Sequence, residues 1–293
     1  VNDIEILDEG NIFKGFNGGT VTTDEGLTIV ADKFEYNKSL NILKAFGDVK
    51  INDQINDYKI FAEKMTYIKN IEKIFTIGNT KALIENNFLF NSKNVELFRN
   101  QKILISSENS TITDEDSTLY KIDKFEYSLK SKLLKGENIE VTTNYDKSIN
   151  EKDIYKFKDG IFNLENKDFT ASNTKIYVKK NIFDVSENDP RLYGVSSKKK
   201  GLVTKVKKGV FTSCAKNDNC PPWSIKSKVI THDKSKKQLI YDHSVLKIYD
   251  VPVLYFPKFF HPDPTVDRQS GFLQPHLNNS KILDTSLLAP YIH

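Results

Sequence analysis

The residues best suited to chemistry lie in the last third of this sequence. Both cysteines, all five histidines and all nine prolines occur at or after Pro190. A metal site is not expected, because the spacing of Cys214, Cys220, His232 and His243 fits no common zinc motif. The sequence also lacks the motifs G-x-x-x-x-G-K-[ST], G-x-S-x-G and H-E-x-x-H. It therefore predicts neither an enzymatic activity nor a cofactor.

A basic cluster also lies beyond Pro190. Its members are Lys198, Lys199, Lys200, Lys205, Lys207 and Lys208. Such a cluster is typical of a solvated face, of a contact with an anionic lipid headgroup, or of a nucleic-acid surface. Aromatic residues are not interleaved with these lysines, which argues against nucleic acid as a partner. Headgroup contact remains as the functional hypothesis beside the solvated face.

Composition divides the chain at the same point. Residues 1–189 hold 26 basic and 32 acidic residues, a net charge of −6, and no proline. Residues 190–293 hold 17 basic and seven acidic residues, a net charge of +10. No run of 18 apolar residues occurs, so no membrane-spanning helix is predicted. The two parts therefore differ in charge and in proline content, and we expect them to face different surroundings.

The first 189 residues contain an internal repeat. A short motif beginning at Ala31 returns three times, with Phe34, Met65, Val95 and Phe125 at equivalent positions. The steps between these four residues are 31, 30 and 30 residues. A second segment follows in three copies, around Gly47, Gly78 and Gly136. Repeats of this kind stack, because no single copy can bury its apolar face alone.

Each copy is predicted to form a strand, a turn and a second strand. Apolar and charged side chains alternate with a period of two, and no segment shows a sustained 3.6-residue pattern. The apolar stripe has two interpretations, a packed core or the inner face of an open groove for lipid chains. The stripe residues proposed for lipid contact are Phe34, Tyr36, Phe46, Met65, Tyr67, Phe125 and Tyr127.

An ordered set of motifs occupies the last part of the chain. It comprises Phe211-Thr212-Ser213-Cys214, Trp223, Ile230-Thr231-His232-Asp233, the run Val251–Pro257, His261–Pro264 and Arg268–Pro275. In this order, after the 30-residue hairpin repeat, the set resembles the LptD family of LPS-assembly outer-membrane proteins, also called OstA or Imp. The repeat itself resembles the OstA-like domains of that transport system. The resemblance covers nearly the whole chain.

The resemblance implies an all-β fold, an OstA-like twisted, open β-jellyroll that leads into the start of an outer-membrane β-barrel. Residues 1–262 would form the jellyroll, repeat-rich over 1–189 and proline-rich and basic over 190–262. Residues 263–293 would form a linker and the first strands of a truncated barrel. The implied function is lipopolysaccharide transport, in which the groove receives lipid from a periplasmic bridge and passes it to the barrel. The alternatives are a soluble periplasmic carrier of the same fold and a structural β-solenoid.

The resemblance also implies roles for cysteines and prolines. At the periplasmic face of the outer membrane, cysteines are normally oxidised. A Cys214–Cys220 disulfide is expected in this chain, although in the family the cysteine matching Cys214 can pair with a cysteine in the barrel. Pro275 and Pro290 match prolines that weaken the seam through which lipid leaves the barrel sideways. The alternative is that both merely mark strand ends.

The expected partners follow from the same resemblance. Ile4 and Ile6 begin in mid-repeat with no polar cap ahead of them, so this edge is expected to pair with a periplasmic bridge protein of the LptA type. Lipopolysaccharide is the expected ligand. An LptE-type lipoprotein and the outer membrane are expected to meet the full barrel.

Overall fold

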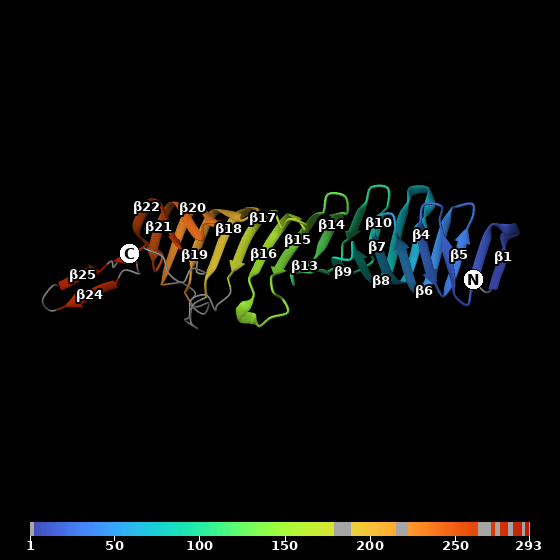
Figure 1. The fold of residues 1–293 in the computed structure, drawn as a ribbon, viewed down its shortest axis with the longest axis horizontal. Helices are drawn as coiled ribbons and strands as arrows, with labels where there is room; N and C mark the ends of the chain where they lie inside the picture. Colours follow the sequence, from blue (N-terminus) through green and yellow to red (C-terminus); the bar gives the residue numbers. More distant parts are fainter. Residues whose placement is uncertain are drawn as a thin grey trace.

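The chain forms a long stack of antiparallel strands in a computed structural model (Figure 1). The structure describes residues 3–178, 189–214, 222–262, 271–272, 276–280, 284–288 and 291–292. Within these residues the regular elements are strands and three short 3₁₀ helices, so the all-β prediction is confirmed. The helices are η1 (Asp8–Gly10), η2 (Lys69–Ile71) and η3 (Ile149–Glu151).

The strands fall into two groups by length. The first group mixes short and long strands: β1 (Asp3–Leu7), β2 (Ile12–Phe16), β3 (Gly19–Thr22), β4 (Leu27–Ala31), β5 (Lys33–Asn37), β6 (Ile42–Asp53), β7 (Tyr58–Ile68), β8 (Lys73–Ile84), β9 (Phe88–Lys93), β10 (Glu96–Phe98), β11 (Ile103–Ser106), β12 (Ser110–Thr113), β13 (Leu119–Ile122) and β14 (Lys124–Ser128). The second group has only long strands: β15 (Leu133–Thr142), β16 (Ile154–Asn163), β17 (Phe169–Tyr177), β18 (Arg191–Lys200), β19 (Val203–Thr212), β20 (Trp223–Asp233), β21 (Gln238–Ile248) and β22 (Val251–Pro262).

The short strands form two hydrogen-bonded rows. The long strands β6, β7, β8 and β15 belong to both rows. The first row runs β1, β2, β5, β6, β7, β8, β10, β11, β14 and β15. The second row runs β3, β4, β6, β7, β8, β9, β12, β13 and β15. From β15 to β22 each strand pairs with the next along its length. The rows are therefore two layers of one sheet that folds over on itself.

Each long strand bends near its middle. In β6 the register shifts between Phe46 and Val49, where Gly47 and Asp48 have φ of 76° and 40°. A Cβ atom on Gly47 would lie 2.9 Å from Cγ of Asp32, so this bend requires glycine. Further along, left-handed residues recur at 35-residue steps in β15, β17, β19 and β21, at Asn138, Asn173, Lys208 and His243.

The bend and the turns define the two long edges of the stack. Buried hydroxyl pairs line the bend, such as Thr174 with Ser197 at 2.6 Å and Ser227 with Ser244 at 2.8 Å. At the opposite edge, the turns of the first row face the turns of the second row. We call this edge the seam, because side chains and not the backbone join the layers there.

Apolar side chains fill the space between the layers in two clusters. The larger cluster extends from Leu27 to Ala171, and the smaller from Ile176 to Tyr241. The main sheet ends with β22, whose outer residues are exposed. Beyond it, β23 (Gly271–Phe272) pairs with β26 (Tyr291–Ile292), and β24 (His276–Ser280) with β25 (Asp284–Leu288). The division into a jellyroll over 1–262 and barrel strands over 263–293 stays a prediction.

Candidate functional site

A cavity of about 650 Å³ lies between the layers where the two apolar clusters meet. Its volume is within the range of about 300–1,000 Å³ that is usual for small-molecule sites. Strands β13 and β15 to β21 contribute its walls. The apolar residues that line it are Tyr120, Val141, Tyr155, Phe157, Phe162, Phe169, Ile176, Val178, Pro190, Leu192, Val206, Phe211, Ile230 and Leu239.

Aromatic rings form the wall nearest the larger cluster. The ring of Phe157 lies 5.4 Å from that of Phe162 and 5.2 Å from that of Phe169, measured between centroids. Tyr155 stacks on Phe157 at 6.4 Å with an interplanar angle of 15°. Burial raises the pKa of Tyr155 above its ordinary value, so its hydroxyl stays neutral. This wall is therefore apolar and uncharged.

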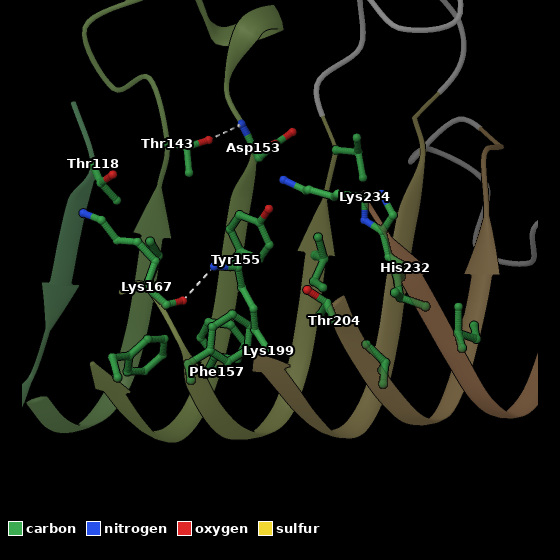
Figure 2. A pocket seen from close by; sticks show the side chains of 18 of the residues that line it. Thr118, Thr143, Asp153, Tyr155, Phe157, Lys167, Lys199, Thr204, His232 and Lys234 are labelled. Atoms are coloured by element: carbon green, nitrogen blue, oxygen red, sulfur yellow. Dashed lines mark hydrogen bonds between the residues drawn. The ribbon is translucent and has the colours of Figure 1, made fainter. Parts of the chain in front are cut away.

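Lysines gather at the seam side of the cavity. Lys167, Lys199, Lys234 and Lys237 all line it, together with His232. Figure 2 shows Lys167 and Lys199 beside the aromatic wall, with Lys234 and His232 on the strands that follow. All four lysines belong to the first-row side, at or next to its turns. An amphiphile with apolar chains and an anionic head would match this arrangement.

The charge of this lysine rim is only partly neutralised. Lys167 pairs with Asp114 and, at 3.4 Å, with Asp116. Lys199 Nζ donates a hydrogen bond to the carbonyl oxygen of Lys167 at 2.8 Å. Within the described residues, no carboxylate forms a salt bridge with Lys199, Lys234 or Lys237. Three of the four rim lysines therefore form no salt bridge with a described carboxylate, at the mouth of an apolar cavity that Asp116 and Asp153 also line.

The pKa of Lys199 is lowered by burial and by the lysines around it. Burial lowers this pKa below its ordinary value of 10.5, and the nearby charges of Lys234 and Lys167 lower it further. Asp168 acts in the opposite direction without reversing the shift. A bound anion would relieve the repulsion among these ammonium groups.

The stripe residues predicted to contact lipid lie elsewhere. Phe34, Met65, Tyr67, Phe125 and Tyr127 are at most 6% exposed and form part of the larger apolar cluster. Tyr36 packs against that cluster, and Phe46 is half-buried on the alternate face of β6 beside the bend. None of the seven lines the 650 Å³ cavity. At this end of the stack the stripe is packed, in keeping with the first of its two interpretations, and its contact with lipid stays a prediction.

The predicted lysine cluster divides between two faces. Only Lys199 of the six lines the cavity. Lys198 and Lys205 are exposed and lie opposite each other in the β18–β19 ladder. Lys200, Lys207 and Lys208 are exposed as well. These five lie on a solvated face outside the cavity, and their contact with a headgroup stays a prediction.

The other predicted residues are placed only in part. Cys214 is a free thiol whose Sγ lies 3.7 Å from the carbonyl oxygen of Trp223. Cys220, Pro275 and Pro290 fall outside the described residues, so the disulfide and the lateral gate stay predictions. In the part of the chain that the structure describes, no group of three potential ligands could hold a metal ion. Nor does any helix there have the length and apolarity to cross a membrane.

Sequence reasoning missed most of the cavity. The pattern that could have revealed the cavity is the continuation of the repeat beyond residue 141, where the step is 35 residues in place of 30. Lys167, Lys199 and Lys234 stand 32 and 35 residues apart, next to equivalent turns. These three lysines can be recognised as equivalent positions of the repeat only when the 35-residue step is used.

Comparisons with known proteins identify similar sequences. The chain is 35% identical over 86 residues to the LPS-assembly protein LptD of Legionella pneumophila (strain Paris), which covers 29% of this chain and 10% of that protein. It is 32% identical over 121 residues to the LPS-assembly protein LptD of Hahella chejuensis, covering 41% of this chain and 14% of that protein. The matched part thus spans about a tenth of the length of these relatives. The resemblance to LptD proteins is confirmed.

Two further comparisons add less. No family model matches the chain. Among solved structures, the chain is similar to the crystal structure of LptH, described as the LptA homologous periplasmic component of the lipopolysaccharide transport device from Pseudomonas aeruginosa. The TM-score is 0.33 and the identity 15%, over 36% of this chain and 78% of that one. This likeness is too distant to carry an argument.

Proposed function

We propose that this chain carries lipopolysaccharide during its assembly into the outer membrane, with acyl chains held in the 650 Å³ cavity and the anionic headgroup held at the lysine rim. One observation carries the proposal: an apolar cavity opens toward four lysines, of which Lys199, Lys234 and Lys237 form no salt bridge with a described carboxylate. The similarity to LPS-assembly proteins supports the same function.

The physical chemistry of the cavity suits such an amphiphile. Each methylene group transferred from water into an apolar site contributes about 0.8 kcal/mol, so acyl chains supply most of the affinity. Phosphate groups require charged hydrogen-bond donors, which Lys167, Lys199 and Lys234 provide on one side. A purely structural solenoid would gain stability by filling this space with side chains. The transport function therefore explains the cavity better than the structural alternative does.

The two ends of the sheet support proposals about partners. Among the described residues, β1 at one end pairs with β2 alone, and Ile4 and Ile6 are more than 60% exposed. An edge of this kind can add a strand from another protein, and we assign it to a bridge protein of the LptA type. At the other end, within the part of the chain that the structure describes, β22 pairs with β21 alone and exposes Val251 and Phe260, which suits burial against further protein.

The location follows from the same function. A chain that receives lipid from a bridge and passes it to a barrel would work at the periplasmic face of the outer membrane. The whole protein would then include the barrel and its LptE-type lipoprotein.

A direct binding experiment tests the proposed function. Val178→Trp places a large ring in the cavity, whereas Val195→Trp places the same ring on an exposed site of β18. We expect purified chain to bind lipopolysaccharide, the Val178 variant to bind at least tenfold more weakly, and the Val195 variant to bind as the parent does. Equal binding by all three proteins would show that the cavity is not the lipid site.

A further inference from the structure

Three cationic side chains cross the seam and join its two rows of turns. Arg99 reaches Asp53, Lys132 reaches Glu85, and Lys167 reaches Asp114. In each pair the cation belongs to a first-row turn and the carboxylate to a second-row turn. The seam is therefore held by ion pairs along the N-terminal part of the stack, up to the start of the cavity.

The three pairs differ in how firmly they are fixed. The Arg99 and Asp53 side chains are 5% and 0% exposed, and several hydrogen bonds hold the guanidinium. Arg99 also pairs with Glu72, so its guanidinium is held from several sides and away from solvent. The Lys167 side chain is 30% exposed and lines the cavity, where a ligand can reach it. Of the three, the Lys167 pair is the one that a ligand can compete for.

The Lys167–Asp114 pair is also the last of these three cross-seam pairs along the chain. On the cavity side its neighbour along the rim is Lys199, whose ammonium group contacts the carbonyl oxygen of Lys167 itself. Lys199 and Lys234 have no salt bridge within the described residues. A phosphate placed at this rim would meet two unneutralised ammonium groups and would draw Lys167 as a third.

We propose that Lys167 is a shared cation: it latches the seam through Asp114 when the cavity is empty, and turns to a phosphate of the lipid headgroup when the cavity fills. This inference rests on the proposed function. It adds that headgroup binding unlatches the seam at the edge of the cavity, so that the space between the layers can widen for a bulky lipid.

The Asp114 side chain is 3% exposed, and it keeps one hydrogen bond when Lys167 leaves. Its Oδ1 accepts a hydrogen bond from the backbone N–H of Thr118 at 2.9 Å, and its Oδ2 takes the contact with Lys167. The turn therefore keeps its own hydrogen bond when the lysine leaves. Asp114→Asn preserves an acceptor for Thr118 while it removes the negative charge that competes with the ligand.

The test compares two probes that differ only in phosphate: dodecyl phosphate, used below its micellar concentration, and 1-dodecanol, used below its solubility limit. Their affinities are measured by calorimetry on the full 293-residue chain. Without the competing carboxylate, we expect Asp114→Asn to bind dodecyl phosphate about 2- to 5-fold more tightly. Lys167→Ala should bind that probe roughly 10-fold more weakly. Binding of 1-dodecanol should be the same in both variants as in the parent.

Matched controls come from the neighbouring pair. Lys132→Ala and Glu85→Gln break a cross-seam pair that does not line the cavity, so neither should alter the preference for phosphate. Asp116→Asn provides a second variant that does not endanger the fold, because this side chain is largely exposed. It should strengthen dodecyl phosphate binding in the same direction as Asp114→Asn, by a smaller factor.

The outcomes separate this inference from the proposed function. If the parent binds neither probe, the proposed function is wrong, and the proposal that Lys167 is a shared cation is wrong as well. If both probes bind, but Asp114→Asn and Asp116→Asn leave the phosphate preference unchanged, the latch alone is wrong. The same conclusion follows if Lys132→Ala reduces the preference as much as Lys167→Ala does.

Discussion

Arg99 and Asp53 are 46 positions apart in sequence, yet Nη2 of the arginine lies 3.0 Å from Oδ2 of the aspartate, across the seam. The same guanidinium contacts Tyr58 Oη at 3.3 Å and pairs with Glu72. One side chain thus joins the turns of both rows. It joins the two layers in the part of the stack that the larger apolar cluster fills.

We predict that Arg99→Ala strongly destabilises the fold. The substitution leaves Asp53 buried without its cation, and breaking a buried pair in this way costs about 3–5 kcal/mol. Urea denaturation measures the loss in the free energy of unfolding. Lys132→Ala serves as the control, because a more exposed pair contributes only about 0–1 kcal/mol. Equal losses for the two variants would contradict the special role of Arg99.

The Asp53 carboxylate should make stability depend on acidic pH. Burial alone would raise its pKa, but hydrogen bonds from Asn56, Arg99 and Tyr58 outweigh burial, and the pKa lies below the ordinary value of 3.8. The unfolded chain therefore binds this proton more readily than the folded chain does. The stabilisation is complete above pH 3.8 and is lost as the pH falls through the lowered folded pKa. In Asp53→Asn this component of the acid denaturation curve should disappear.

Lys199 should produce a dependence of the same sign at alkaline pH. Its folded pKa lies below 10.5, so between the two values the unfolded chain binds more protons. The free energy of unfolding should rise with pH across that window, and Lys199→Met should abolish the rise. Dodecyl phosphate should weaken the effect, because a bound anion favours the charged lysine. A ligand that leaves the pH profile unchanged would show that it does not contact Lys199.

The N-terminal edge gives a prediction about association. Ile6→Pro removes an N–H from β1, and it should weaken binding to a purified bridge protein of the LptA type. Ile6→Thr retains the N–H and shortens the side chain, so it should bind nearly as the parent does. Surface plasmon resonance compares the three proteins. If the proline variant binds as well as the parent, this edge is not the contact.

The sequence was sufficient to predict the strands of the repeat but not the position of the cavity. Alternation showed which side chains of the strand around Phe34 face inward. It carried no information on the distance between the layers, and that distance decides whether an inward stripe packs or leaves a space. Phe125 and Phe157 follow the same pattern and both belong to the larger apolar cluster, yet only Phe157 of the two lines the 650 Å³ cavity.

The lysine rim was hidden for a related reason. Lys198 and Lys199 are adjacent in sequence, but a strand places them on opposite faces, so a compositional cluster does not form one surface. The lysines that line the cavity together lie in or next to separate turns, at Lys167, Lys199 and Lys234. Only the folding of the long strands brings those turns together.

Photo-cross-linking in cells tests most directly whether lipid occupies the cavity. A photoreactive residue replaces Tyr155, which lines the cavity, or Phe125, which lies in packed core, or Val195, which is exposed. We predict a lipopolysaccharide adduct at position 155 that is several times more abundant than at the other two positions. Capture at position 125 with none at position 155 would contradict this account and place the lipid along the stripe first predicted from the sequence.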